Sequence, residues 1–344
     1  MNIRTATRQD RLRAAVIGVG HMGKHHARLY HELAGVELAA VVDKDPERAR
    51  EIAGKYGAPA FGDVSEVLDK IDVATVAVPT VAHAEVARPL IEAGIPALIE
   101  KPLAPDVAAA QQILEWAQRH RAVIQVGHSE RFNPVVLAMK RMGVVPKFIE
   151  THRISPFTFR SADIGVVFDM MIHDIDLVLH MVGERQYQVH AVGVNVLGPH
   201  EDIANARVEF ASGAVVNMTA SRLALKTERK MRVFCPDAYL SMDYGKKSGI
   251  AVKKDANLDL LKMARERDFE DLSQMQGVDF GSLVNVEPLI IDDVEPLRAE
   301  IESFLAAARG ESSPEVSVED GVAAVTLAQA IVDDINSRGW RDGV

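Results

Sequence analysis

The sequence is poor in cysteine, with the single residue Cys235 in 344. One cysteine cannot form an internal disulfide, so we expect a reducing cytoplasm and a packing role for this thiol. No apolar run approaches the roughly 18 residues that a membrane span needs, and the polar, basic N-terminus lacks the apolar core of a signal peptide. The net charge of −10 argues against a general affinity for nucleic acid. We therefore expect a cytoplasmic protein that binds neither membranes nor nucleic acid.

Motifs for metal binding are also scarce. The chain has no cysteine cluster and no His-Glu-x-x-His motif, which argues against a catalytic zinc site. Its 48% hydrophobic and 26% charged residues are ordinary for a soluble globular protein. The length predicts two domains.

The first third alternates short apolar runs with amphipathic segments. This order predicts a parallel, doubly wound Rossmann sheet with helices on both faces. The expected strands are 13–18, 36–43, 73–79, 96–102 and 122–128, and the expected helices are 22–33, 46–57, 83–94 and 107–120.

Beyond this point one long helix is expected over 165–183, followed by strand-like segments. These segments are 187–198, 204–222 with a hairpin turn at 211–214, 230–244 and 248–254, and two helices close the chain at 295–310 and 319–335. Strands that follow one another in this way favour a large, mostly antiparallel open sheet in an α+β domain. Residues 255–290 show no pattern that we can assign.

The fold class is therefore α/β, with two expected domains. Residues 11–127 form the dinucleotide-binding domain, and residues 128–344 form the domain for substrate binding and oligomerisation. We allow for the closing helices packing back on the first domain. An open antiparallel sheet needs its free face covered, which predicts a homodimer or homotetramer.

A glycine motif follows the first strand. Gly18, Gly20 and Gly23 have the G-x-G-x-x-G spacing around His21 and Met22, between a strand and a helix. The first glycine allows a tight turn, the second lets a pyrophosphate approach, and the third lets the helix pack closely.

An acidic residue completes this dinucleotide motif. Asp43 comes 20 residues after Gly23, at the end of the second strand. Its carboxylate suits the ribose 2′-hydroxyl of NAD and repels the 2′-phosphate of NADP, although the adjacent Lys44 softens that preference. The sequence predicts NAD, with NADP less favoured.

Further cofactor contacts are expected where the next strands end, because ligands bind beyond the carboxyl ends of such strands. Pro79, Thr80 and His83 follow the third strand, and Glu100 and Lys101 follow the fourth. Lys101 would extend toward the nicotinamide. A solvated surface lysine is the open alternative.

The segment "FDMMIHDID", residues 168–176, places polar side chains in an apolar helix. At about 100° per residue, Asp169, His173, Asp176 and His180 fall in a stripe about 60° wide, which predicts the lining of a cleft. Asp174 lies outside the stripe, so we expect it at the surface or an interface. A buried polar network and a metal site remain the alternatives.

Together, "GVGHMG", "VVD", "IEKP" and "DMMIHDID" resemble the glucose–fructose oxidoreductase, inositol dehydrogenase and rhizopine catabolism (Gfo/Idh/MocA) family over nearly the whole chain. The resemblance implies oxidation or reduction of a secondary alcohol on a sugar or cyclitol. It also implies an oligomer formed through the second domain's sheet. It assigns Lys101 to the family's E-K-P motif, and Asp169 and His173 to its D-x-x-x-H pair, as catalytic residues.

Three further segments, 127–134, 151–167 and 171–177, resemble the branch of this family that acts on UDP-linked sugars. That branch implies oxidation at C3 of a UDP-linked N-acetylhexosamine. Arg131, Arg153 and Arg160 are the expected donors to a diphosphate, and His128 and Asn133 are further expected substrate contacts. Surface arginines that pair with carboxylates are the alternative.

The expected mechanism transfers a hydride to the nicotinamide while a side chain takes the hydroxyl proton. His173 is the favoured base, and a hydrogen bond from Asp169 would fix its tautomer and favour its protonated form. Lys101 would stabilise the substrate oxygen or would itself take the proton. An inositol or free-sugar dehydrogenase, and a non-catalytic sensor of NAD or sugar, are the competing functions. The exact sugar and the direction stay open.

Overall fold

The computed structural model describes residues 11–158, 164–254 and 284–338. Among these residues, no helix is long and apolar enough to cross a membrane.

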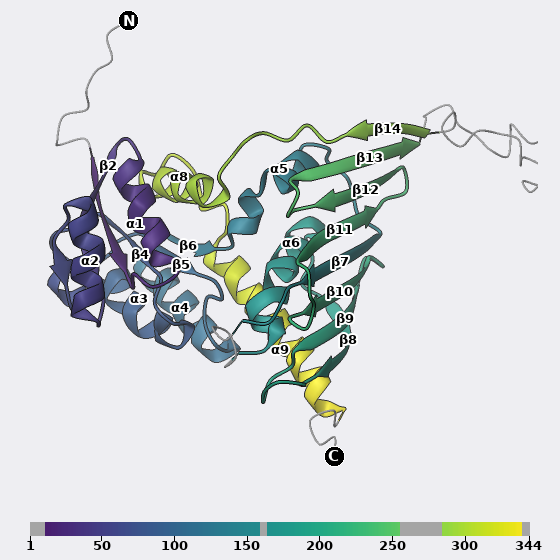
Figure 1. The fold of residues 1–344 in the computed structure, drawn as a ribbon, viewed down its shortest axis with the longest axis horizontal. Helices are drawn as coiled ribbons and strands as arrows, with labels where there is room; N and C mark the ends of the chain where they lie inside the picture. Colours follow the sequence, from purple (N-terminus) through teal and green to yellow (C-terminus); the bar gives the residue numbers. More distant parts are fainter. Residues whose placement is uncertain (1–10, 159–163, 255–283, 339–344) are drawn as a thin grey trace, which may run out of the picture.

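The first sheet has six parallel strands, which confirms the expected Rossmann arrangement (Figure 1). In sheet order its strands are β3 (Ala60–Phe61), β2 (Val36–Val42), β1 (Leu12–Ile17), β4 (Val73–Val76), β5 (Ala97–Glu100) and β6 (Ile124–Gly127). The order runs outward in both directions from β1 and β4, so their carboxyl ends flank the point where ligands bind in such sheets.

Both faces of this sheet are covered because the side chains of β1 alternate between two cores. Ala14 and Val16 belong to the core that holds residues of α1, α2 and α8, whereas Ala15 and Ile17 belong to the core that holds residues of α3 and α4. These helices are α1 (Gly23–Glu32), α2 (Pro46–Tyr56), α3 (His83–Glu92), α4 (Val107–His120) and α8 (Pro296–Ala308). Since α8 lies near the end of the chain, part of the C-terminal region helps to form the hydrophobic core on one face of the first sheet.

The second sheet has eight strands and is antiparallel except where β7 pairs with β10. In sheet order the strands are β14 (Val284–Pro288), β13 (Ser248–Lys254), β12 (Ala238–Asp243), β11 (Glu228–Phe234), β7 (Phe148–Ile154), β10 (Val215–Ser221), β9 (Ile203–Phe210) and β8 (Tyr187–Val194). Sequence analysis missed β7, although it is central. Thr151 and Arg153 share its buried face with Ile149, so no alternation of apolar and polar residues reveals the strand.

The expected long helix over 165–183 is divided in two. A π-helix, η6 (Val167–Met171), leads directly into α6 (Ile172–Val182). A π-turn changes the angular phase between the residues on either side of it, and such turns are frequent at functional sites. Asp169 lies in η6, and His173 lies in α6.

The closing helix α9 (Val318–Ser337) packs against α4 of the first half and against α6 and β8 of the second. Just before it, the Val126 amide of β6 donates to the Val316 carbonyl at 3.0 Å. The remaining elements are α5 (Pro134–Lys140) and the 3-10 turns η2 (Val64–Glu66), η3 (Thr80–Ala82) and η4 (Ser129–Phe132). The C-terminal helices thus join the two sheets.

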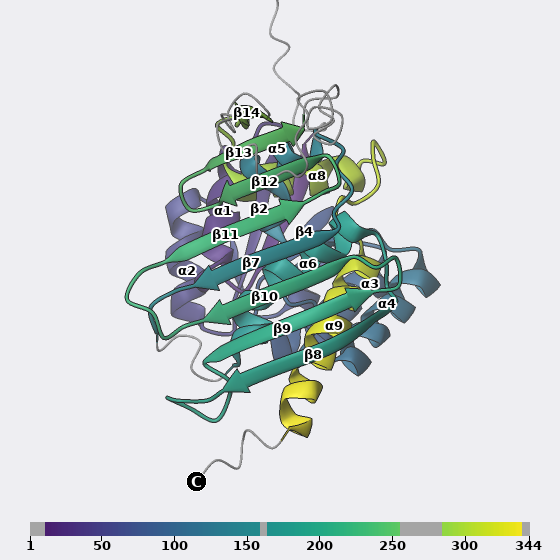
Figure 2. The same ribbon diagram turned by 90° about the vertical axis from the view of Figure 1, so that its right-hand side faces the viewer.

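Figure 2 shows the second sheet face-on, with the helices behind it. No helix of the described residues covers the face turned to the viewer. Several large apolar side chains are exposed on the strands of this outer face, namely Val192, Val194, Phe234, Ile250 and Val286.

Candidate active site

A cavity of about 1600 Å³ lies beyond the carboxyl ends of β1, β2, β4 and β5. Its far wall comes from η6, the first turn of α6 and the ends of strands in the second sheet. Most of the residues expected to bind the cofactor or to carry catalysis line it: Gly18, Gly20, His21, Met22, Asp43, Pro79, Thr80, Glu100, Lys101, Asp169 and His173.

The glycine loop has the geometry that a dinucleotide requires. Gly18 has φ +84°, and a Cβ there would lie 2.8 Å from the Ala77 carbonyl. A Cβ on Gly23 would lie 1.8 Å from the Gly18 oxygen, so only glycine lets α1 begin this close to the turn. A Cβ on Gly20 would meet nothing within 4 Å, which leaves open space at the N-terminus of α1 for a pyrophosphate.

Asp43 is fixed at the end of β2 by two backbone amides. Its Oδ2 accepts a hydrogen bond from Val19 N and its Oδ1 from Asp45 N, each at 2.9 Å. Arg48 Nη1 lies 3.5 Å from Oδ1, and Lys44 and Arg48 both line the cavity. The carboxylate is therefore oriented beside the glycine loop, as the residue that binds the adenosine ribose in such folds must be. These features fit a nicotinamide dinucleotide.

Glu100 anchors the end of β5 against α1. Its Oε1 lies 2.7 Å from His26 Nε2, and both side chains are buried. Burial alone would raise the pKa of Glu100, but the hydrogen bond and charge of His26 outweigh it and the pKa is lowered. The next residue, Lys101, is held by this anchored strand end.

Lys101 crosses from the first sheet to the π-helix. Its Nζ donates to the Asp169 carbonyl at 2.7 Å and lies 3.8 Å from the Asp169 Oδ1. Both side chains keep about a fifth of their surface exposed, at 20% and 23%. The structure therefore brings together two of the expected catalytic residues, which are 68 positions apart.

His173 faces the same cavity, but its surroundings differ from those we expected. Burial lowers the pKa of His173 well below its usual range, and the charges of Lys101, Arg153 and Arg229 add to the effect. Within the described residues, no hydrogen bond joins Asp169 to His173, and His173 Nδ1 has no partner. The expectation that Asp169 binds the imidazole and favours its charged form is wrong, because the π-turn separates the two residues and Asp169 contacts Lys101 instead.

Asp174 is also placed differently from our expectation of a surface or interface residue. It is 2% exposed and accepts two hydrogen bonds from Arg153, at 3.0 and 2.8 Å. Arg153 also donates to Glu130 Oε1 at 3.0 Å. Arg153 therefore lines the cavity with its charge already bound by two carboxylates.

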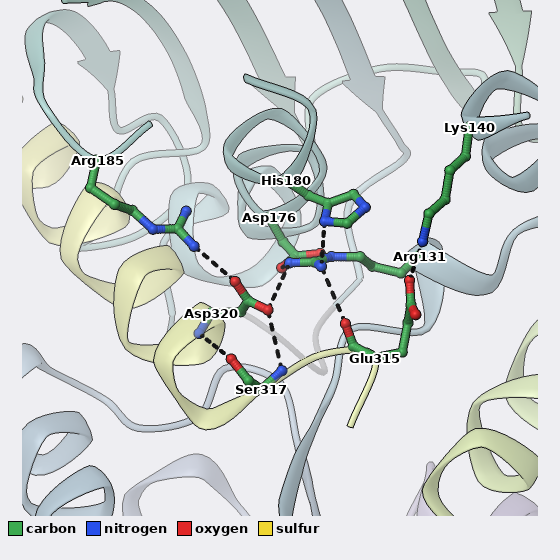
Figure 3. Close-up of polar contacts among 8 residues, drawn as sticks. All are labelled: Arg131, Lys140, Asp176, His180, Arg185, Glu315, Ser317 and Asp320. Atoms are coloured by element: carbon green, nitrogen blue, oxygen red, sulfur yellow. Dashed lines mark hydrogen bonds and ion pairs between the residues drawn. The ribbon is translucent and has the colours of Figure 1, made fainter. Parts of the chain in front are cut away.

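Arg131 lies at the centre of a buried polar network (Figure 3). Its Nε and Nη2 donate to the two carboxylate oxygens of Asp176, both at 2.7 Å, and its Nη1 donates to His180 Nδ1 at 2.8 Å. Its Nη2 lies 3.6 Å from Asp320 at the start of α9, whose other oxygen accepts from Arg185. The network joins η4, α6 and α9.

Neither Arg131 nor Asp176 lines the cavity. The expectation that Asp176 shares a cleft face with His173 is therefore wrong, since α6 turns Asp176 toward η4 and α9. Arg131 is 3% exposed and fully occupied by Asp176 and His180, so we no longer propose it as a phosphate contact.

Three other expected contacts, His83, Asn133 and His128, do not line the cavity. The ring nitrogens of His83 lie 3.0 Å from the carbonyls of Val78 and Pro102, so His83 ties two strand ends together behind the cavity. Asn133 caps α5 by accepting from Val135 N. His128 is 1% exposed and does not line the cavity. Arg160 lies outside the described residues.

Comparison with known proteins agrees with this geometry. Residues 12–128 match the family model described as an oxidoreductase family with an NAD-binding Rossmann fold, and residues 147–241 match the Gfo/Idh/MocA C-terminal domain. The chain is 38% identical over 234 residues to UDP-N-acetylglucosamine 3-dehydrogenase of Acidithiobacillus ferrooxidans, covering 68% of this chain and 74% of that protein. The chain belongs to the Gfo/Idh/MocA family. It is therefore an oxidoreductase, and the resemblance drawn from its motifs is confirmed.

Two further comparisons bear on the assignment. The solved structure of the same Acidithiobacillus enzyme superposes with a TM-score of 0.83 at 30% identity, over 95% of this chain and 98% of that one. Inositol 2-dehydrogenase of Rhizobium meliloti is 27% identical over 335 residues, covering 94% of this chain and 97% of that protein. This Gfo/Idh/MocA chain is thus similar along nearly its whole length to a UDP-sugar dehydrogenase and to an inositol dehydrogenase.

Sequence analysis missed some polar residues of the cavity. Glu130, Glu201, Arg222 and Arg229 all line the cavity. Arg229 carried a signal that we did not use: it stands two and four residues before Met231 and Val233, which are buried on one face of β11. Residues at i, i+2 and i+4 of a strand share a face, so Arg229 belongs to the inner side of the sheet.

A second buried acid lies behind Glu100. Glu300 of α8 is fully buried, and neither of its carboxylate oxygens has a hydrogen-bond partner among the described residues. Burial raises the pKa of Glu300 well above its usual range, and the charges of Glu100 and Asp176 add to this. The folded protein therefore keeps this group protonated at pH values where the unfolded chain has ionised it.

Glu300→Gln is therefore expected to remove a pH-dependent loss of stability. A raised folded-state pKa stabilises the native state fully below the unfolded pKa of about 4.3, and that contribution is lost as pH rises toward the folded pKa. The free energy of unfolding of the variant, relative to that of the wild type, should increase by on the order of 1–3 kcal/mol when the pH rises from 5 to 8. Urea unfolding at both pH values measures this gain. Glu302→Gln, on the exposed face of α8, should show no such gain, and equal shifts for both variants would contradict the explanation.

Proposed function

We propose that the protein uses NAD to oxidise a secondary hydroxyl of a sugar, at C3 of a UDP-linked N-acetylhexosamine. The observation that carries the proposal is the meeting of Lys101 and His173 in one cavity with the dinucleotide loop. The match to a UDP-N-acetylglucosamine 3-dehydrogenase supports the choice of substrate.

His173 and Lys101 have different roles in the proposed reaction. A bound NAD would accept the hydride from the carbinol carbon. We assign His173 as the base that takes the hydroxyl proton, because its lowered pKa keeps the imidazole neutral and able to accept. Lys101, held by Asp169, would donate to the substrate oxygen as negative charge develops there. The products are a ketone, NADH and a proton.

For the cofactor we propose NAD rather than NADP. The Asp43 carboxylate is fixed by Val19 N and Asp45 N where the adenosine ribose would lie, so it is ready to accept bonds from a 2′-hydroxyl. A 2′-phosphate would be repelled by it. Lys44 and Arg48 nearby weaken this preference without reversing it, since Arg48 already lies 3.5 Å from Asp43.

Inositol, a free cyclitol, is the second candidate substrate, and the full-length similarity to inositol 2-dehydrogenase favours it. Against it, Lys101 and Arg229 both line the cavity and help to lower the pKa of His173, in a chain whose net charge is −10. Arg229 forms no ion pair among the described residues, and such a cation beside the catalytic pair suits an anionic substrate. A non-catalytic sensor is disfavoured because it would not need Lys101 and His173 together.

We also propose a homo-oligomer formed through the outer face of the second sheet. This face is not covered by any described helix and exposes Val192, Phe234 and Ile250 among other apolar side chains. A second copy that packs on this face would bury them. Size-exclusion chromatography with light scattering measures the resulting mass.

The substrate proposal is tested by mixing the protein with NAD or NADP and a panel of UDP-sugars, free sugars and inositols. Absorbance at the wavelength of the reduced cofactor reports turnover. We expect oxidation of UDP-N-acetylglucosamine with a higher kcat/KM for NAD than for NADP, and a ketone at C3 in the product. A trapping amine or a coupled transaminase removes that ketone and prevents a stalled equilibrium. Turnover of inositol but of no UDP-sugar would overturn the proposal.

A further inference from the structure

Arg229 is a cavity-lining cation whose charge is not bound. It is exposed, stands at the start of β11 and lines the cavity together with Lys101 and His173. Among the residues that the structure describes, no hydrogen bond or ion pair involves its guanidinium. Because an arginine is charged at all physiological pH values, it offers several N–H donors to a ligand in this cavity.

The neighbouring arginines are occupied. Arg153 lies directly across from Arg229 on β7, and its guanidinium is bound by Asp174 and Glu130. Arg222 donates to Asp202 Oδ1 at 2.5 Å and to the Ile164 carbonyl at 2.7 Å. These carboxylates bind Arg153 and Arg222 directly, and among the described residues none of them forms an ion pair with Arg229, although the charges of Glu130 and Asp174 act on it.

Arg229 lies on the inner face of the sheet, directly opposite Arg153. The carboxylates of Glu130 and Asp174 interact electrostatically with Arg229 without forming an ion pair with it, and they offset part of the repulsion between the two arginines. The charge of Arg229 also helps to lower the pKa of His173. An anion bound by Arg229 would oppose this effect on His173. A 3-dehydrogenase substrate can place such an anion near the reacting hydroxyl, because C3 and the phosphate-bearing C1 of a hexose are separated by one ring carbon.

We propose that Arg229 binds the diphosphate of the nucleotide sugar and thereby selects it over a free sugar or cyclitol. This inference rests on the proposed function and replaces the phosphate contact first assigned to Arg131. Arginine pairs with phosphate oxygens through two parallel hydrogen bonds, which fixes position as well as charge. The diphosphate charge would also raise the pKa of His173 in the complex and make it a better base.

The experiment compares Arg229→Gln with Arg232→Gln in the full-length protein. Arg232 is on the same strand but points to the outer face, where it pairs with Glu150 at 2.9 Å, so both variants lose one charge from β11. UDP alone is the binding probe, titrated by calorimetry into the NAD-loaded protein. We expect Arg229→Gln to weaken UDP binding and to lower kcat/KM for UDP-N-acetylglucosamine, each by about 10- to 100-fold, and Arg229→Lys to restore part of both. Arg232→Gln should stay within about threefold of the wild type.

A second readout separates ligand binding from a loss of structure. Removing the Arg229 charge should raise the pKa of His173, so the acidic limb of the pH profile of kcat/KM should move to higher pH in Arg229→Gln. Equal UDP affinities in the two glutamine variants would overturn the inference, even if the wild type oxidises UDP-N-acetylglucosamine. Conversely, a wild type that oxidises no UDP-sugar would refute the proposed function, while weakened UDP binding in Arg229→Gln would still support the diphosphate site.

Discussion

His173→Asn and Lys101→Ala are each expected to lower kcat by about 10²- to 10⁴-fold while leaving NAD affinity unchanged. Both side chains reach the reacting end of the cavity, and neither forms part of the glycine loop or the Asp43 site. Steady-state kinetics measures kcat, and quenching of intrinsic fluorescence measures NAD binding. His120→Asn, at the exposed C-terminal end of α4, is the control and should keep wild-type turnover.

The pH profile then decides which side chain takes the proton. An imidazole base works only when neutral, so activity is lost as pH falls through its pKa. Because the pKa of His173 is lowered, the acidic limb of kcat/KM should lie below the ordinary histidine value of about 6.5. A lysine base would instead need to lose a proton, which places the limb well above neutrality. An acidic limb of kcat/KM above pH 8, together with near-normal turnover in His173→Asn, would show that Lys101 is the base.

Asp176→Ala is expected to lower the free energy of unfolding by about 3–5 kcal/mol. The substitution leaves Arg131 charged and buried at 3% exposure, without the carboxylate that accepts two of its donors. Removing both charges in Arg131→Met/Asp176→Leu should cost much less, because no unpaired charge then remains inside the protein. Urea unfolding followed by circular dichroism gives the three values.

The matched control is Glu92→Gln, which breaks an exposed ion pair with Arg88 on α3. Screening by solvent limits such a pair to about 1 kcal/mol or less. If Asp176→Ala proved no more harmful than this control, the network of Figure 3 would not be what holds α6 against η4 and α9. Since α6 carries His173, loss of kcat in the surviving folded fraction of Asp176→Ala would show that the network also positions the base.

Local patterns were enough to predict most of the fold. The alternation of apolar runs and helices up to residue 127 identified the parallel sheet, because each strand and each helix carries its own periodicity. The G-x-G-x-x-G spacing with Asp43 and the E-K-P lysine identified residues that line the cavity. Each of these features can be recognised from residues that lie close together in the sequence. Strand β7 was not predicted, because Arg153 and Thr151 occupy its buried face and no apolar alternation marks it.

The charges that are bound and those that face the cavity could be identified only from the folded protein. The amino-acid sequence placed cationic side chains and the pair of Asp169 and His173 in the second domain. It did not determine that α6 supplies carboxylates to Arg131 and Arg153, leaving Arg229 as the proposed phosphate contact. Nor did it reveal that a π-turn directs Asp169 toward Lys101 rather than His173. The reason is physical: the partner of a buried charge comes from segments tens of residues away, and a strand or helix pattern carries no information about them.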